Sequence, residues 1–284
     1  MIKAIEFPKD VFETKEALFE ALKANKERLV TIKKSAEKRA DTVSYGYLDA
    51  SVKLDTTKDD PAAQMTNMDT LNVKVVINTT NYLDSHGDVH VKGIWSKSIS
   101  DNASKGFLHL QEHERDFDKV ISDNAKGYVQ SISWKKLGLP YDGNTEALIF
   151  ESTIEKKRNE FMLNQYANGW VKNHSVGMRY VQLELAINSE AEYDKEYKAL
   201  WDEYYPTIAN KEVADERGYF WVVKEAKIIE GSAVVMGSNN ATPTLENKSE
   251  AADSTFENNE PPAGTQTDTD KSVNEQLKNL LTKF

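Results

Sequence analysis

Cysteine is absent from the 284 residues. Its absence excludes disulfides, thiolate metal sites and a cysteine nucleophile. No apolar run approaches the roughly 18 to 20 residues that a membrane-spanning helix needs. The N-terminal MIKAIEFPKD also lacks the hydrophobic stretch of a signal peptide. We therefore expect a protein of a reducing compartment such as the cytoplasm, with no membrane partner.

Positive charge is in deficit, with 36 Lys and Arg against 46 Asp and Glu and a net charge of −10. This balance argues against broad binding to nucleic acid. The hydrophobic share of 39% and charged share of 29% are those of an ordinary globular chain. The length then suffices for one large domain or two small ones.

The N-terminal region has a helical pattern followed by a polar stretch. Apolar residues recur at helical spacing through 11–40, which predicts one helix: Val11, Leu18, Leu22, Leu29, Ile32 and Ala36. Such a helix packs either on a partner or on its own domain, and the pattern does not decide between them. Residues 49–70 are polar and without period, as in a linker.

From Leu71 onward the pattern changes to short strands with two helical insertions. Alternation and turn signals, among them the Asp-Gly pair at 142–143, predict strands at 71–78, 120–123, 127–137, 146–154, 170–185 and 218–236. A helix is expected over 154–168, ended by Gly169 as a C-terminal cap. A second helical stretch is expected within 189–217, with a stop at Pro206.

Beyond Pro243 the chain becomes polar and acidic, and Pro261-Pro262 interrupts it. Such a segment buries too little apolar surface to offset its ordering entropy. Residues 272–284 regain a helical pattern. We therefore expect an N-terminal region at 1–70, a main domain at 71–245 and a disordered tail with a short helix at 246–284.

The residues able to carry chemistry centre on five histidines and one serine. Histidine is the usual base for a serine nucleophile because its pKa lies near neutrality. His174 directly precedes Ser175, and neighbouring side chains on a strand point to opposite faces, which argues against His174 as the base. His109 and His113 share one face on either a strand or a helix, and this spacing suits a base or a metal ligand.

A metal site is the competing interpretation of the same histidines. The stretches HLQEH and SHGDVH bring together ligand types that suit zinc: His86, His90, His109 and His113. However, the HxxxH spacing lacks the glutamate of the HExxH motif in its usual place. The residues alone therefore predict a hydrolase site and leave its chemistry open.

Four stretches in order resemble the tailed-phage prohead protease family, whose fold is shared with herpesvirus assemblin. They are HGDVHVKGIWSKSI (86–99), FLHLQEHERDFDKVIS (107–122), NEFMLNQYANGWVKNHSVGMRYV (159–181) and AKIIEGSAVVMGSNNATPTL (226–245). The nucleophile block, Ser-Ile-Gly-Phe in the family, reads Ser-Val-Gly-Met here. The resemblance covers about two-thirds of the chain, and the order of the blocks is more specific than any one of them.

The resemblance implies a catalytic set. Ser175 matches the nucleophile and His113 the general base. The viral relatives use a second histidine as third member, but no histidine follows Ser175 here, so a carboxylate is expected. Glu230 is our prediction and Glu225 the alternative, and this group would orient the His113 imidazole. Backbone N–H groups around Gly177 and Arg179 would hold the oxyanion, and the missing Cβ of Gly177 would let the backbone approach the substrate closely.

The resemblance also implies a fold and a role. The fold would be α+β, a closed and mostly antiparallel β-barrel with flanking helices. The protein would be a serine endopeptidase without a cofactor, acting in the host cytoplasm inside the assembling prohead. Its substrates would be the scaffold protein, the major capsid protein and itself, with self-association possible. An inactive structural or scaffold-binding prohead component is the alternative from another functional class, and a histidine-ligated metallohydrolase is the third.

Overall fold

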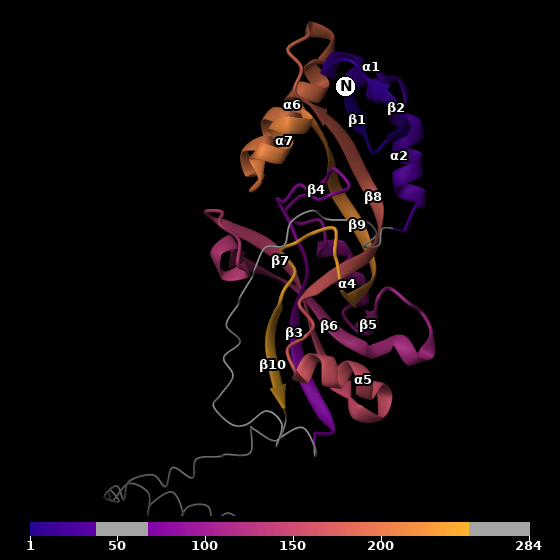
Figure 1. The fold of residues 1–284 in the computed structure, drawn as a ribbon, viewed down its shortest axis with the longest axis vertical. Coiled ribbons are helices and arrows are strands. Elements are labelled where there is room, and N and C mark those ends of the chain that lie inside the picture. The colour runs from indigo at the N-terminus through magenta and orange to yellow at the C-terminus, as the bar shows by residue number, and fades with distance from the viewer. Residues whose placement is uncertain (38–67, 250–284) are drawn as a thin grey trace, which may run out of the picture. The chain divides into compact units, whose positions relative to one another are not determined.

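The computed structural model describes residues 1–37 and 68–249. The described residues belong to one compact unit, which is mixed α+β (Figure 1). The helices of the described part are α1 (Lys15–Ala24), α2 (Lys26–Ser35), α4 (Ser96–Asn102), α5 (Lys156–Ala167), α6 (Lys195–Tyr204) and α7 (Lys211–Arg217). The strands are β1 (Ile2–Ala4), β2 (Phe7–Phe12), β3 (Thr70–Thr79), β4 (Asp88–His90), β5 (Phe107–Gln111), β6 (Val120–Ser133), β7 (Asn144–Glu155), β8 (Asn173–Ile187), β9 (Tyr219–Val234) and β10 (Thr244–Ser249).

The main sheet runs in the order β10-β3-β7-β6-β5-β9-β4, and β8 also pairs with β9. Two pairings with β9 are parallel, those of β4 and β5, and the other ladders are antiparallel. The predicted α+β, mostly antiparallel architecture is therefore correct. Closure into a barrel would need a further ladder between β8 and β10, and the described residues show none.

Strand β9 is the organising strand of the sheet. On one edge it pairs with β8 from Asn173↔Val234 to Ile187↔Tyr219. On its other edge it pairs first with β4 and then with β5. Figure 1 shows β8 and β9 side by side along most of their length. Because β9 has neighbours on both edges, its last residues bring β5 and β8 close to each other.

The N-terminal segment departs from the prediction of one helix over 11–40. The chain instead begins with the β1–β2 hairpin and continues as two helices that meet at Asn25. Asn25 has φ −107° and ψ 7°, and its side-chain amide donates to the Ala21 carbonyl, which ends α1. A polar side chain that bonds the local backbone competes with the helix in this way. The part of the predicted helix from residue 38, and the predicted linker up to residue 67, lie outside the described residues.

The two N-terminal helices pack on the chain's own core. Leu18, Leu22 and Leu29 are buried in the same hydrophobic cluster as Trp221 of β9. Lys33 of α2 is also buried, and its ammonium forms an ion pair with Asp88 at 2.5 Å. Of the two alternatives left open by the sequence, packing on a partner or on the same domain, these contacts show the second: Leu18, Leu22 and Leu29 pack on the core of the same chain.

Helices α5, α6 and α7 follow the sequence pattern closely, whereas α4 was not predicted. Helix α5 ends at Ala167, and Gly169 follows with φ 65°, as expected for a glycine after a helix. The acidic aromatic stretch forms α6 and α7, and Pro206 lies in the 3₁₀ turn Tyr205–Thr207 between them. Trp201 of α6 packs against Phe220 of β9 at 5.0 Å between ring centroids. This insertion therefore covers one face of β9.

The C-terminal boundary lies later than predicted. Strand β10 pairs with β3 as far as Ser249↔Leu71, beyond the expected end of the domain at residue 245. Residues 250–284, including the predicted helix at 272–284, lie outside the described part.

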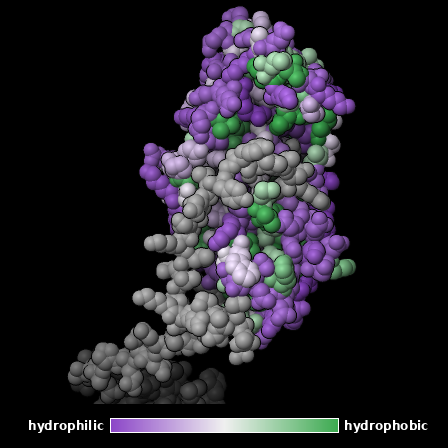
Figure 2. Space-filling view, viewed as in Figure 1, coloured by the Kyte–Doolittle hydropathy of each residue, from purple (hydrophilic) through white to green (hydrophobic). Residues whose placement is uncertain are grey.

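The face shown in Figure 2 is mainly hydrophilic, with small separate hydrophobic areas. Among the described helices none is long and apolar enough to cross a membrane.

Candidate active site

The register between β8 and β9 places Ser175 opposite Ser232, and Gly177 opposite Glu230. Residues directly opposite each other in an antiparallel pair have side chains on the same face. Residues two apart on one strand also share a face. Ser175, Ser232 and Glu230 therefore face the same side of the sheet, and all three are buried, with 6%, 0% and 1% of their surface exposed.

His113 reaches this same face. Its Nδ1 lies 2.6 Å from Oε1 of Glu230. An ionised carboxylate only accepts hydrogen bonds, so in this contact the Nδ1–H of His113 donates to Glu230. Only 4% of His113 is exposed, so the pair is shielded from water. The contact expected between the orienting carboxylate and His113 is present, whereas the catalytic roles of the two residues remain predictions.

Ser232 is a member of this cluster that the sequence analysis missed. Its hydroxyl donates to Oε2 of Glu230 at 2.6 Å and accepts the backbone N–H of His113 at 3.2 Å. Both oxygens of Glu230 thus accept a hydrogen bond, and one side chain ties the carboxylate to the backbone of the histidine. The available signal was its position two residues after Glu230 on an alternating strand, on the face of Glu230.

A strained turn positions His113. The N–H of Glu114 donates to the carbonyl of Gln111 at 2.9 Å. The two central residues, Glu112 and His113, have φ values of 51° and 60°. Positive φ at both central positions is the pattern of a type I′ turn, which normally uses glycine or asparagine. Each such residue costs on the order of 1 to 3 kcal/mol, and backbone strain of this kind concentrates at functional sites.

This turn also corrects the expectation that His109 and His113 share a face. Strand β5 ends at Gln111, and the chain turns immediately afterwards. His109 pairs with Gly231 within the sheet, and its side chain bonds Ser152 and Tyr166 rather than the Glu230 group. The two histidines do not share a face because the strand stops between them.

Gly177 has a steric role that differs from the one expected. A Cβ built on it would lie 1.8 Å from Oε1 of Glu230. The missing side chain therefore makes room for the carboxylate, whereas the sequence analysis assigned that room to a substrate. Any other residue at this position would displace Glu230 from His113.

The positions of the oxyanion candidates follow from the alternation of β8. The N–H of His174 turns away from β9 and donates to the Thr242 hydroxyl at 3.2 Å. Backbone groups alternate in direction along a strand, so those of Gly177 point towards β9 and its ladder, whereas a register irregularity at Gly177/Met178 separates Arg179 from this argument. Arg179 pairs with Lys227 and its side chain is exposed. The assignment of these two residues as oxyanion donors remains a prediction.

Glu225 lies apart from the histidine. It is opposite Gln182 on β8, and its carboxylate pairs with Lys97 at 3.3 Å with 32% of the side chain exposed. Of the two acidic candidates, Glu230 is the one in contact with His113.

The remaining histidines do not gather. His90 lies 3.0 Å from the Asn78 side chain and 3.2 Å from the Tyr180 hydroxyl, and His86 lies 3.9 Å from Asp84. Across residues 1–37 and 68–249 no three His, Asp or Glu side chains are grouped as a metal site would require. The structure therefore does not bring together the four histidines of the metal interpretation.

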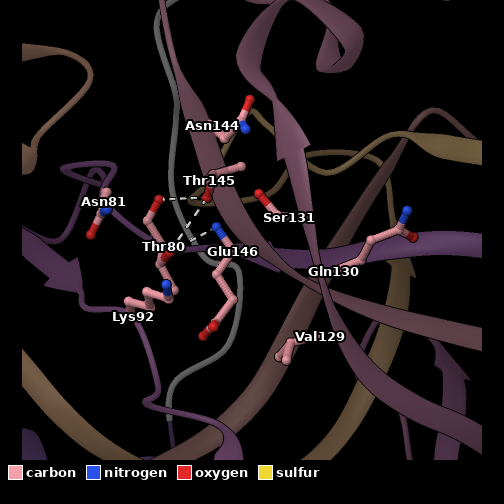
Figure 3. Close-up of a pocket in the computed structure, with 9 residues that line it drawn as sticks. All are labelled: Thr80, Asn81, Lys92, Val129, Gln130, Ser131, Asn144, Thr145 and Glu146. Atoms are coloured by element: carbon pink, nitrogen blue, oxygen red, sulfur yellow. Dashed lines mark hydrogen bonds between the residues drawn. The ribbon is translucent and has the colours of Figure 1, made fainter.

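A separate cavity of about 230 Å³ opens between β6, β7 and the residues that follow β3 and β4 (Figure 3). Two threonines on its wall are hydrogen-bonded to each other: the Thr145 hydroxyl donates to the Thr80 carbonyl at 2.7 Å. Its charged lining residues are Lys92 and Glu146, and it contains no histidine and none of the predicted site residues. The cavity therefore lacks a histidine–carboxylate pair such as that of His113 and Glu230.

The chain was also compared with known proteins. A scan against protein-family models, a search of curated proteins and a search of solved structures each found no match.

Proposed function

We propose that this chain is a serine endopeptidase of the prohead protease type, with Ser175 as nucleophile, His113 as base and Glu230 as orienting carboxylate. One observation carries the proposal: a buried His113–Glu230 hydrogen bond of 2.6 Å on the face of the sheet that also presents Ser175. A histidine paired to a carboxylate beside a serine is the arrangement that activates a hydroxyl nucleophile.

In this proposal each residue has one task. Glu230 accepts the Nδ1–H of His113, which fixes the tautomer and stabilises the imidazolium that forms later. His113 Nε2 takes the proton of Ser175 as its oxygen attacks the peptide carbonyl, and then gives that proton to the leaving amine. The strained turn at 112–113 supports the proposal, because the structure holds His113 in an unfavourable backbone conformation beside the carboxylate.

The proposed setting is the host cytoplasm, inside an assembling prohead. The substrates would be the scaffold protein, the major capsid protein and the protease itself, with self-association of copies. We further propose that the sheet approaches a closed barrel. Hydrogen bonds from Thr244 to the Val171 carbonyl at 3.0 Å, and from Asn247 to the Tyr166 carbonyl, support this, because they tie β10 to the segment leading into β8.

Co-expression with a capsid protein and a scaffold protein of the same genome tests this function. Mass spectrometry of the products should show defined cleavage with the wild-type chain and none with Ser175→Ala. If neither wild type nor Ser175→Ala cleaves, but capsid assembly needs the protein and either version supports it, the protein is instead the inactive structural component. Cleavage that is lost with a chelator and retained by Ser175→Ala would establish the metal alternative.

A further inference from the structure

A second polar network lies on the other face of the strands that carry the site. The Tyr166 hydroxyl of α5 lies 3.0 Å from Nε2 of His109 and 2.9 Å from Nε2 of His174. Nδ1 of His109 lies 3.0 Å from the Ser152 hydroxyl, and Nδ1 of His174 lies 2.9 Å from the Thr242 carbonyl. Five segments of the chain thus meet in one row of hydrogen bonds.

The chemistry of the groups fixes the direction of every bond in this row. A carbonyl only accepts, so His174 carries its proton on Nδ1 and accepts on Nε2. Tyr166 must then donate to His174, and its oxygen is left to accept the Nε2–H of His109. With Nε2 protonated, His109 accepts at Nδ1 from the hydroxyl of Ser152. One arrangement of protons satisfies the whole row.

These groups are fully buried, with His109 and His174 at 0% and Tyr166 at 1% exposure. Burial lowers the pKa of His109 to about 3, assisted by His174, and that of His174 to about 4. It raises the pKa of Tyr166 well above its ordinary value. The row is therefore neutral at physiological pH. A buried polar row is tolerated only when every member is hydrogen-bonded, as here, and such a network rigidifies the core that contains it. The presence of this row in place of apolar packing calls for a reason.

The position of the row supplies one. His174 directly precedes Ser175 on β8, and β8 lies on the edge of β9 opposite β5. His109 lies on β5, which ends at the turn that holds His113. Tyr166 thus bridges the strand of the proposed nucleophile and the strand that leads to the proposed base.

We propose that Tyr166 is a positioning residue that sets the spacing between Ser175 and His113 through His174 and His109. It does not touch the reacting atoms. The inference rests on the proposed function for its catalytic consequence, whereas the geometry of the row can be tested without any activity. A displacement of about 1 Å in a catalytic group can lower a rate about 100-fold, so a residue that fixes the strand spacing has a measurable effect.

The test variant is Tyr166→Phe, which keeps the ring and removes the bridging hydroxyl. Tyr180→Phe is the matched control. Tyr180 is also buried and lies on β8, the strand of Ser175, and its hydroxyl donates to Asp88 at 2.7 Å. Both variants lose a buried hydroxyl, so both should lose a similar amount of stability. Only Tyr166→Phe should affect the proposed site.

Two readouts are compared in the full-length protein. The first is the rate at which a fluorophosphonate probe labels Ser175, which should fall about 10- to 100-fold in Tyr166→Phe and less than about threefold in Tyr180→Phe. The second is NMR of the imidazole and backbone nitrogens. Wild type should show Nδ1–H for His174 and Nε2–H for His109, and Tyr166→Phe should shift the Ser175 amide and the His113 imidazole signals.

The possible results distinguish the positioning role of Tyr166 from the proposed function. The positioning inference is wrong if the Ser175 and His113 signals are unchanged in Tyr166→Phe. It is also wrong if the probe labels Ser175 in this variant as fast as in wild type. If wild type is never labelled, the proposed function is wrong, and the NMR comparison still decides whether Tyr166 sets the geometry. Equal effects of the two Phe variants on Ser175 would mean a general loss of packing and would also overturn the inference.

Discussion

The two faces of the β5–β9–β8 strands hold similar side chains in different environments. On one face His113 bonds a buried carboxylate, and Ser175 and Ser232, opposite each other on β8 and β9, face the same side. On the other face His109 and His174 bond a phenol, a hydroxyl and a backbone carbonyl, with no carboxylate among the partners. The partner therefore distinguishes the histidine suited to acid–base chemistry from those suited to holding strands together.

Removal of the serine hydroxyl should have the largest effect. Ser175→Ala should lower peptide hydrolysis on the order of 10⁶-fold, since it removes the proposed nucleophile. The fold should persist because only one oxygen is lost, and circular dichroism with urea unfolding checks this. Ser131→Ala, at an exposed position on β6, is the matched control and should hydrolyse peptides like wild type. Equal rates for the two variants would contradict the nucleophile assignment.

The carboxylate face is tested next. Glu230→Gln should lower turnover by about 10² to 10⁴, because an amide can favour the wrong His113 tautomer. Glu225→Gln, which loses only a partly exposed pair with Lys97, should remain near wild type. Initial rates on one peptide substrate make the comparison. If only Glu225→Gln is impaired, Glu225 and not Glu230 is the orienting carboxylate. If neither variant is impaired, the site is a Ser–His dyad.

The face of the strands that holds His109 and His174 should make the free energy of unfolding depend on pH in mild acid. His109 and His174 have pKa values near 3 and 4 in the folded state, against 6.5 ordinarily. The unfolded chain therefore binds more protons below pH 6.5, so stability is full above that pH and falls as the pH is lowered towards the folded values. At pH 4 each histidine should have removed on the order of 3 kcal/mol from the free energy of unfolding.

Urea unfolding at pH 7 and pH 4.5 measures this dependence. His174→Gln should reduce the difference in unfolding free energy between the two pH values. His86→Asn changes a histidine outside the row of hydrogen bonds and should leave that difference as it is in wild type. An undiminished difference in His174→Gln would show that the acid sensitivity arises elsewhere.

The smallest effect is expected at Ser232. Ser232→Ala removes one donor to Glu230 and the acceptor of the His113 N–H. The His113–Glu230 bond remains, so turnover should fall only about 10- to 100-fold, the effect of one lost hydrogen bond to a charged group. Ser232→Thr, which restores the hydroxyl, should recover part of the rate. A loss as large as that of Glu230→Gln would mean that Ser232 does more than hold the carboxylate.

Much of the fold could be predicted because it depends on local periodicity. Alternation located β3, β7 and β9, and Gly169 marked the end of α5. The break of the N-terminal helix at Asn25 and the whole of strand β10, Thr244–Ser249, were missed. The first depends on a single side chain bonding to the backbone, and the second on pairing with a strand far away in the sequence.

The site was predictable in its residue types more than in its geometry. The absence of a histidine after Ser175 pointed to a carboxylate, but the choice between Glu225 and Glu230 depends on register. Irregularities interrupt the β8–β9 ladder at Gly177/Met178 and again near Gln182, and each one disturbs the alternation of faces. The turn at 112–113 was also hidden, because glutamate and histidine are unusual at positive φ.

The most direct test of the central claim is the labelling of Ser175 by a fluorophosphonate in wild type and in His113→Ala. Peptide mapping by mass spectrometry should find the label on Ser175 in wild type. The labelling rate should fall at least about 10³-fold when the base is removed, since members of such a triad act as a unit. An unlabelled Ser175 in folded wild-type protein, or equal labelling in both proteins, would contradict the account.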